Sequence, residues 1–247
     1  MTAGEYVDYL LRWLEELRQT LYKKDAYVLG ISGGIDSAVC AHLLQKTGRE
    51  VFAYTLPAEV SSSSDISDAR QVFRDCGFQY REISIAPMFE MLMQEIKPEL
   101  PAKFEREQVL YGNLMARLRM VSLFTLAQAR EAVVVGTDNL AEYHTGYFTK
   151  FGDGAADCFP LAKLRKEQVR ELAKYLGVNN KIIEKAPSAG LWQGQTDEDE
   201  MGVSYQEIDA FLRGENVSDS AKERIDFWHN RSVHKRMLPP VPEKAWE

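Results

Sequence analysis

Apolar residues recur along this chain in two spacings, and their order predicts helices that alternate with strands. Segments with apolar residues three or four positions apart have the period of an amphipathic helix. Before residue 140 these helical segments are 3–24, 37–46, 65–76, 87–97 and 104–130. Short apolar runs of strand length lie between them. The runs are 26–29, 51–55, 78–85 and 132–135.

This alternation predicts an α/β fold, in which a doubly wound, mostly parallel sheet carries helices on both faces. The run 132–135 is apolar at every position, as expected for a strand that is buried on both sides. No internal repeat or low-complexity linker interrupts the chain, so we expect residues 1–247 to form a single domain. Ligands of such sheets bind beyond the carboxyl ends of the strands.

The last third of the chain is predicted to be helical. Segment 166–177 has one apolar face, and further helices are expected at about 201–212 and 218–236. The stretch 190–200 is acidic and contains glycine, which fits a lid over a site. Its alternative is a segment with no role in the site.

A glycine-rich loop joins the first predicted strand to the helix after it, and this loop predicts a phosphate site. Gly33 and Gly34 permit backbone conformations that are closed to other residues, so several N–H groups can point at one phosphate. Ser32 and Ser37 can donate hydroxyls, and Asp36 can supply an oxygen ligand for Mg²⁺. The glycine loop consists of Gly30, Ile31, Ser32, Gly33, Gly34, Ile35, Asp36 and Ser37.

The glycine loop matches neither of two common nucleotide motifs. No lysine follows the glycines where a Walker A loop requires one, and the spacing differs from the dinucleotide fingerprint GxGxxG. A serine-rich turn at the start of a helix is therefore the alternative to a phosphate site.

A second loop, 136–138, follows the run 132–135 and should emerge at the same edge of the sheet. This arrangement would bring Glu142 close to Asp36, although the two are far apart in the sequence. Two carboxylates and a triphosphate can form the oxygen shell of Mg²⁺. The alternative is that Glu142 only caps a helix or forms an ion pair at the surface.

Two further segments carry residues suited to ligand contact. Residues 146–157 show no helical or strand period, yet they are rich in aromatic and charged side chains, so we interpret them as a wall around a flat ligand. On the predicted helix 104–130, Arg117 and Arg119 lie about 200° apart around the axis. The two arginines therefore cannot face the same way, so one of them can face a ligand or a subunit while the other forms ion pairs at the surface.

Composition limits the partners and the location. A net charge of −7 argues against general binding of nucleic acid. No stretch reaches the length of a membrane span, and acidic residues near the N-terminus exclude a signal peptide, so we expect a cytoplasmic protein without membrane contact. The three cysteines are widely spaced and odd in number, which supports neither a disulfide framework nor a zinc site.

The motif SGGIDS at 32–37 resembles the pyrophosphate-binding loop of the ATP pyrophosphatase superfamily. Five later blocks occur in the order found in ammonia-dependent NAD synthetases, namely GTDNLAE, GYFTKFGDGAAD, PLAKLRK, KAPSAGLWQGQTDE and VHKR. The resemblance covers nearly all of 28–236, and GMP and asparagine synthetases lack the second block. It implies the ATP pyrophosphatase fold, which is of the adenine nucleotide alpha hydrolase type.

The resemblance also implies an activity and its residues. The activity is the ATP-dependent amidation of deamido-NAD to NAD with ammonia, through an acyl-adenylate and with release of AMP and pyrophosphate, as the last step of NAD biosynthesis. Asp36 and Glu142 would bind Mg²⁺, and Asp36 and Lys166 would act in catalysis. The implied ATP residues are 30–37, Thr137, Lys166 and Ser188, where many relatives have Thr. The residues implied for deamido-NAD are Arg117, Lys150, Asp157, His234 and Lys235.

Other functions stay open at this point. From the helical pattern alone Lys166 is an ordinary surface lysine, and only the resemblance selects it. The chain could adenylate another carboxylate or an RNA. It could also be a silent nucleotide-binding module, but such a module should have lost metal ligands or loop glycines, and all are present. Because the chain is too short for an added glutaminase domain, we expect free ammonia to be the nitrogen source.

A homodimer is expected for two reasons. The resembling family is dimeric, and segment 104–130 carries apolar residues around more of its circumference than one core contact would use. The extra apolar residues are Met115, Met120, Leu123 and Phe124. We expect part of this helix to pack on a second copy, with Arg117 at the seam.

Overall fold

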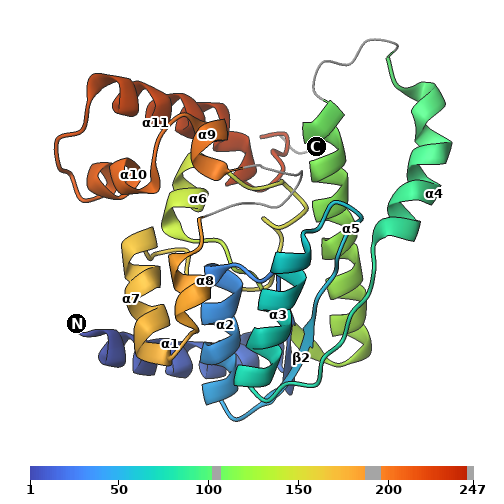
Figure 1. The fold of residues 1–247 in the computed structure, drawn as a ribbon, viewed down its shortest axis with the longest axis vertical. Coiled ribbons are helices and arrows are strands. Elements are labelled where there is room, and N and C mark those ends of the chain that lie inside the picture. Colours follow the sequence, from blue (N-terminus) through green and yellow to red (C-terminus); the bar gives the residue numbers. More distant parts are fainter. Residues whose placement is uncertain (102–106, 187–195, 244–247) are drawn as a thin grey trace.

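The computed structural model describes residues 1–101, 107–186 and 196–243. Within these residues the chain folds around a three-stranded sheet with helices on both faces (Figure 1). Neighbouring strands are parallel, and β1 lies between β2 and β3. The strands are β1 (Ala26–Gly30), β2 (Glu50–Tyr54) and β3 (Ala132–Val135). The predicted fold class, a parallel sheet between helices, is confirmed.

Both faces of the sheet are buried, because side chains of β1 alternate between two hydrophobic clusters. Tyr27 and Leu29 pack into one cluster, whereas Ala26 and Val28 pack into the other. A strand with two buried faces needs apolar residues at every position. This explains why the apolar runs in the sequence are nearly continuous.

Helices from distant parts of the chain cover these two faces (Figure 1). The first cluster is covered by α1 (Ala3–Glu16), α2 (Ile35–Lys46), α3 (Ser63–Asp75), α7 (Lys166–Leu176) and α8 (Asn180–Glu184). The second is covered by α4 (Ala86–Ile96) and α5 (Glu107–Ala129). None of these helices, nor any other in the described ranges, is long and apolar enough to span a membrane.

A third hydrophobic cluster holds the C-terminal helices against the segment that follows β3. Arg224 and Trp228 donate hydrogen bonds to the carbonyl oxygen of Met201, which ties the last helix to its neighbours. The helices of this C-terminal layer are α6 (Leu140–Thr145), α9 (Asp197–Met201), α10 (Tyr205–Leu212) and α11 (Asp219–Arg231). The remaining short turns are η1 (Leu17–Tyr22), η2 (Lys97–Glu99) and η3 (Val233–Lys235).

The predicted strand at 78–85 does not form. The segment passes the end of β2 and makes one isolated bridge, between Thr55 and Glu82. Three residues after Glu82, Ile85 donates to the carbonyl oxygen of Pro57, but Pro57 has no N–H group to donate to this segment. The ladder therefore stops after one bridge, although Ile83 and Ile85 still pack into the second cluster.

Several predicted helix boundaries were wrong. The opening helix expected at 3–24 ends at Glu16 and continues to Tyr22 as the wider π-helical turn η1, which buries Arg18 against Glu15. The helix expected at 65–76 begins two residues earlier, at Ser63, where Ser62 caps it. The helix expected at about 201–212 begins at Tyr205, and the helix expected at about 218–236 ends at Arg231.

The apolar residues that were expected to reach a second copy from α5 point inward instead. Met115 is buried in the second cluster, and Leu123 and Phe124 pack against it. Met120 lines an internal cavity together with the latter two. On the outer side of α5 the exposed apolar residue is Val121, of which 55% is accessible. The helix is apolar on several sides mainly because it packs on the sheet and lines the cavity.

The glycine loop packs against α3 through Gly33. Gly33 has φ +86°, a left-handed conformation that side chains with a Cβ rarely adopt. A Cβ at this position would lie 2.3 Å from the carbonyl oxygen of Asp65 and 3.1 Å from the amide nitrogen of Ala69. Both the backbone conformation and the close approach of α3 therefore require glycine.

We predict that Gly33→Ala destabilises the fold and distorts the glycine loop. The left-handed conformation alone costs about 1–2 kcal/mol for an L-residue. Gly214→Ala is the matched control, because Gly214 has φ +79° and nothing lies near its Cβ position. Urea unfolding and ATP titration should show a larger loss of stability and of ATP affinity for Gly33→Ala. Equal losses for both variants would contradict the packing argument.

Candidate active site

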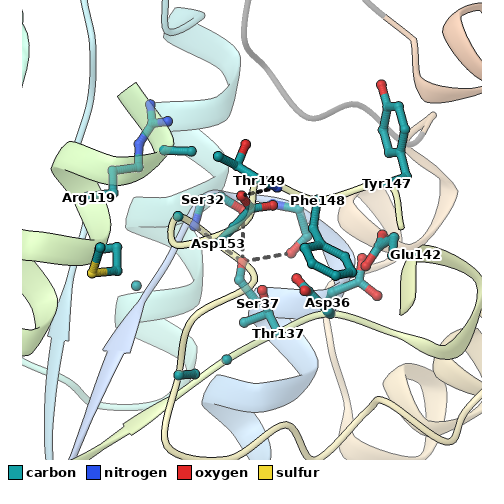
Figure 2. A pocket seen from close by; sticks show the side chains of 18 of the residues that line it. Ser32, Asp36, Ser37, Arg119, Thr137, Glu142, Tyr147, Phe148, Thr149 and Asp153 are labelled. Carbon is teal, nitrogen blue, oxygen red and sulfur yellow. Dashed lines mark hydrogen bonds between the residues drawn. The ribbon is translucent and has the colours of Figure 1, made fainter. Parts of the chain in front are cut away.

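A cavity of about 610 Å³ opens beyond the carboxyl ends of the strands, with the glycine loop on one side (Figure 2). The cavity also receives residues from the loop after β3, from α5, from 146–156 and from η3. These segments meet because the ends of parallel strands share one edge of the sheet. Every residue of the glycine loop except Gly33 lines the cavity.

Hydroxyl groups of the glycine loop hold it in a compact turn. The Oγ atoms of Ser32 and Ser37 are 3.1 Å apart, and Ser37 Oγ donates to the carbonyl oxygen of Gly34. Gly34 is the N-cap of α2, and no side-chain hydrogen bond caps this helix end. The first N–H groups of α2 therefore have no capping side chain, and the positive end of the helix dipole favours an anion here.

Lys166, the first residue of α7, lies between two carboxylates at the edge of the cavity. Its Nζ is 2.6 Å from Oδ2 of Asp36 and 3.4 Å from Oε1 of Glu142, and only 2% of the residue is exposed. Burial alone would lower the pKa of Lys166, but the two carboxylates raise it above its ordinary value, so the ammonium group stays charged. The predicted proximity of Asp36 and Glu142 is confirmed, and the interpretation of Lys166 as a surface lysine is wrong.

Asn139, which the sequence analysis missed, orients both carboxylates. Its Nδ2 donates to Oδ1 of Asp36 at 3.0 Å, and its backbone N–H donates to Oε2 of Glu142 at 3.0 Å. Its Oδ1 accepts from the backbone of α6, which completes a capping box. The alternative that Glu142 caps a helix is therefore correct as well. An Asn three residues before a Glu is a helix-start signal that could have identified Asn139.

Further carboxyl groups are buried near Lys166. Asp138 and Asp197 are 6% and 5% exposed and line the same cavity. Burial and the neighbouring carboxyl groups raise the pKa of Asp138 well above its ordinary value. Burial also raises the pKa of Glu142, although Lys166 opposes this shift. Within the described part of the chain, Lys166 forms ion pairs with Asp36 and Glu142.

Asp36 and Glu142 have the chemistry that Mg²⁺ requires. Carboxylate oxygens are its preferred protein ligands, and it usually takes one or two of them together with water and phosphate oxygens. Among the residues that the structure describes, no group of three or more His, Cys, Asp or Glu side chains is arranged to hold a metal. The donor set therefore fits an ion that is shared with the phosphates of ATP better than one held by protein ligands alone.

The residues expected to contact deamido-NAD fall into two groups. His234 and Lys235 line the cavity, and Lys235 Nζ donates to the carbonyl oxygens of Gly146 and Phe148 at 2.7 and 2.5 Å. The other three are absent from the cavity lining; these are Arg117, Lys150 and Asp157. Their roles stay predictions.

Contacts within the chain account for the positions of these three residues. Asp157 Oδ2 accepts from the backbone N–H of Val134 in β3 at 2.8 Å, and thus extends the sheet edge. Lys150 Nζ donates to the carbonyl oxygen of His234 at 2.6 Å. Arg117 is exposed, and its guanidinium lies 3.4 Å from the carbonyl oxygen of Lys150.

Of the two arginines on α5, Arg119 is the one that lines the cavity. Figure 2 shows it apart from Asp36 and Glu142, on the other side of the view. Its Nε donates to the carbonyl oxygen of Leu56 at 3.0 Å, and within the described ranges it forms no ion pair. Burial lowers its pKa, which reflects the cost of a charge without a carboxylate partner. An anionic ligand group in the cavity could supply that partner.

The segment 146–156 lines the cavity, as predicted for a wall. Tyr147, Phe148 and Thr149 contribute to this side (Figure 2). Thr149 fixes the segment to α5 through Oδ1 of Asn113 at 2.7 Å, and its N–H donates to Asp153 at 2.9 Å. The flat shape of the ligand stays a prediction. Ser188 and the first part of the expected lid, 190–195, lie outside the described residues.

The family model for NAD synthase matches residues 6–239 of this chain. Among curated proteins, the NH(3)-dependent NAD(+) synthetase of Mannheimia succiniciproducens is 60% identical over all of this chain and 99% of its own length.

Solved structures agree with this match. The NMN synthetase of Francisella tularensis superposes with a TM-score of 0.94 at 48% identity, over 99% of this chain and all of that one. The NH3-dependent NAD synthetase of Campylobacter jejuni, solved with a nitrate ion, gives a TM-score of 0.79 at 26% identity, over 98% of this chain and all of that one. The chain therefore belongs to the NAD synthase family of enzymes.

Proposed function

We propose that this enzyme amidates deamido-NAD to NAD with ATP and ammonia, through an acyl-adenylate intermediate. The observation that carries this proposal is the position of Lys166, which lies between Asp36 and Glu142 beside the glycine loop. This arrangement suits the transfer of an adenylyl group, in which negative charge must be stabilised while pyrophosphate leaves. The ammonia-dependent relative at 60% identity supports the choice of reaction.

The first step activates the nicotinate carboxylate. One of its oxygens bonds to the α-phosphorus of ATP while the bond to pyrophosphate breaks. Backbone N–H groups of the glycine loop and the ammonium group of Lys166 would hold the phosphate oxygens and stabilise the charge that develops on them. Asp36 and Glu142 would hold Mg²⁺, which when bound offsets further phosphate charge.

The second step forms the amide. Ammonia attacks the activated carbonyl carbon, the bond from that carbon to the AMP oxygen breaks, and one proton leaves the nitrogen. No side chain needs to form a covalent bond in this scheme. His234 and Lys235 at one side of the cavity, and Arg119 at another, could hold the anionic groups of the nucleotide substrate.

A mononucleotide is the second candidate substrate. The structure with a TM-score of 0.94 is an NMN synthetase, and its 48% identity exceeds that of the Campylobacter jejuni NAD synthetase structure. An enzyme that makes nicotinamide mononucleotide would amidate the nicotinate mononucleotide by the same two steps. The two substrates differ in the AMP half, so the site for the reacting carboxylate can be shared.

The deciding experiment is a direct comparison of substrates. The purified chain is incubated with ATP, Mg²⁺ and ammonium, and with either deamido-NAD or nicotinate mononucleotide, and kcat/KM is measured for each product. A higher kcat/KM for deamido-NAD would support the proposal, and a higher value for the mononucleotide would replace it with the second candidate. Glutamine in place of ammonium should give almost no product. Turnover of neither nucleotide would refute the proposed function.

We predict that Asp36→Asn stops the activation of the nicotinate carboxylate, and not only the formation of the amide. The variant removes a carboxylate that contacts Lys166, so the rate of pyrophosphate release without ammonia should fall about a hundredfold or more. Asp75→Asn on the exposed part of α3 is the control and should match the parent. If Asp36→Asn released pyrophosphate at the parent rate, Asp36 would have no role in activation.

We also propose a cytoplasmic homodimer, with the outer side of α4 and α5 as its interface. These two helices stand together at one side of the molecule (Figure 1). Their outer surfaces expose several large apolar side chains, a feature typical of protein interfaces. The exposed residues are Met88, Met91 and Leu92 of α4 and Val121 of α5.

We predict that Val121→Glu weakens self-association. In a twofold dimer the substitution places two like charges in one apolar interface, which should raise the dissociation constant about a hundredfold or more. Leu21→Glu is the control, because Leu21 is 65% exposed on η1. Sedimentation velocity of the parent and both variants at micromolar concentration is the measurement. A monomeric parent, or a Val121→Glu variant that still forms dimers, would contradict the proposal.

A further inference from the structure

Tyr205, at the start of α10, contacts the cluster around Lys166 from the C-terminal layer. It is 1% exposed, and its hydroxyl oxygen lies 3.2 Å from Oε1 of Glu142 and 3.0 Å from Oδ2 of Asp197. The Nζ of Lys166 lies 4.7 Å from the centre of its ring, within range of a cation–π contact. One side chain thus reaches both a proposed metal ligand and the proposed catalytic lysine.

The hydroxyl of Tyr205 has more acceptors than hydrogens. A tyrosine hydroxyl carries its proton at neutral pH, so it is a hydrogen-bond donor here. A phenolic hydroxyl can donate only one hydrogen. It can therefore donate to Glu142 or to Asp197, but not to both at once.

The same helix also holds the backbone of Lys166. Asp209, one turn after Tyr205 on α10, accepts from the backbone N–H groups of Lys166 and Glu167 at 3.1 and 2.8 Å. Asp209 is 3% exposed, so this contact is as protected from water as that of Tyr205. The helix α10 thus fixes the start of α7 through one residue and the side chains of the cluster through another.

We propose that Tyr205 is a positioning residue for the cation site of Asp36 and Glu142. Its hydroxyl donates to Oε1 of Glu142 and thereby orients this carboxylate for a divalent cation. Its ring meanwhile keeps the ammonium group of Lys166 in place. This inference rests on the proposed function, because it concerns the metal of that reaction.

The test uses Tyr205→Phe, which keeps the ring and removes the hydroxyl. Hydrogen bonds to metal ligands from outside the coordination shell typically change metal affinity 10- to 100-fold. We expect Mn²⁺ to bind about tenfold more weakly in the presence of ATP, as measured by electron paramagnetic resonance. The Mg²⁺ concentration for half-maximal activity should rise by a similar factor. Unchanged or tighter Mn²⁺ binding would overturn the proposal.

A matched control separates positioning from stability. Tyr27 is fully buried, and its hydroxyl donates to the carbonyl oxygen of Leu14 at 3.0 Å, away from the cavity. Tyr27→Phe therefore also removes one buried hydrogen bond and should lower Tm, yet leave Mn²⁺ binding unchanged. A similar loss of Mn²⁺ binding in both variants would show that Tyr205 acts only through stability, and would overturn the proposal.

The coupling between Tyr205 and Glu142 is tested with a double variant. If the hydroxyl acts through Glu142, adding Tyr205→Phe to Glu142→Gln should cause no further loss of Mn²⁺ binding, whereas additive losses would overturn the proposal. Binding of Mn²⁺ with ATP needs no nicotinate nucleotide. A parent that binds Mn²⁺ but amidates neither nucleotide would thus refute the proposed function alone, and a parent that binds none would refute both.

Discussion

The site depends on one buried ionic contact, the ammonium group of Lys166 between the carboxylates of Asp36 and Glu142. Charges at this depth must be paired, since removing one partner of a buried pair typically costs about 3–5 kcal/mol. The three residues come from α2, α7 and α6, so the pairing joins three elements that are distant in the sequence. It therefore holds the site together and also concentrates charge where phosphate chemistry would need it.

The surrounding structure makes this contact possible in two ways. The parallel sheet delivers the glycine loop and the loop after β3 to one edge, because their strands are neighbours. The C-terminal layer then closes the cluster from the other side, where Asp209 caps the start of α7 and Tyr205 reaches Glu142. Water is thereby kept from the ammonium group of Lys166.

Charged side chains of both signs line the cavity. Its acidic cluster lies at the glycine loop, whereas Arg119, His234 and Lys235 line other parts without a described carboxylate partner at ion-pair distance. Such a division suits two anionic substrates, one that shares its phosphates with a metal and one held directly by cations.

The sequence by itself determined two local features, the strands buried on both faces and the glycine loop. It also predicted that Asp36 and Glu142 lie close together, because parallel strands end at the same edge of the sheet. Tertiary structure decided the rest. Helical periodicity marks Lys166 as polar but cannot show that α10 covers it, and it leaves the choice between Arg117 and Arg119 open. Nothing in the sequence indicates the contacts of Tyr205, because one partner of its hydroxyl comes from an element far away in the sequence. Segment 78–85 had the pattern of a strand, but pairing needs a donor that Pro57 lacks.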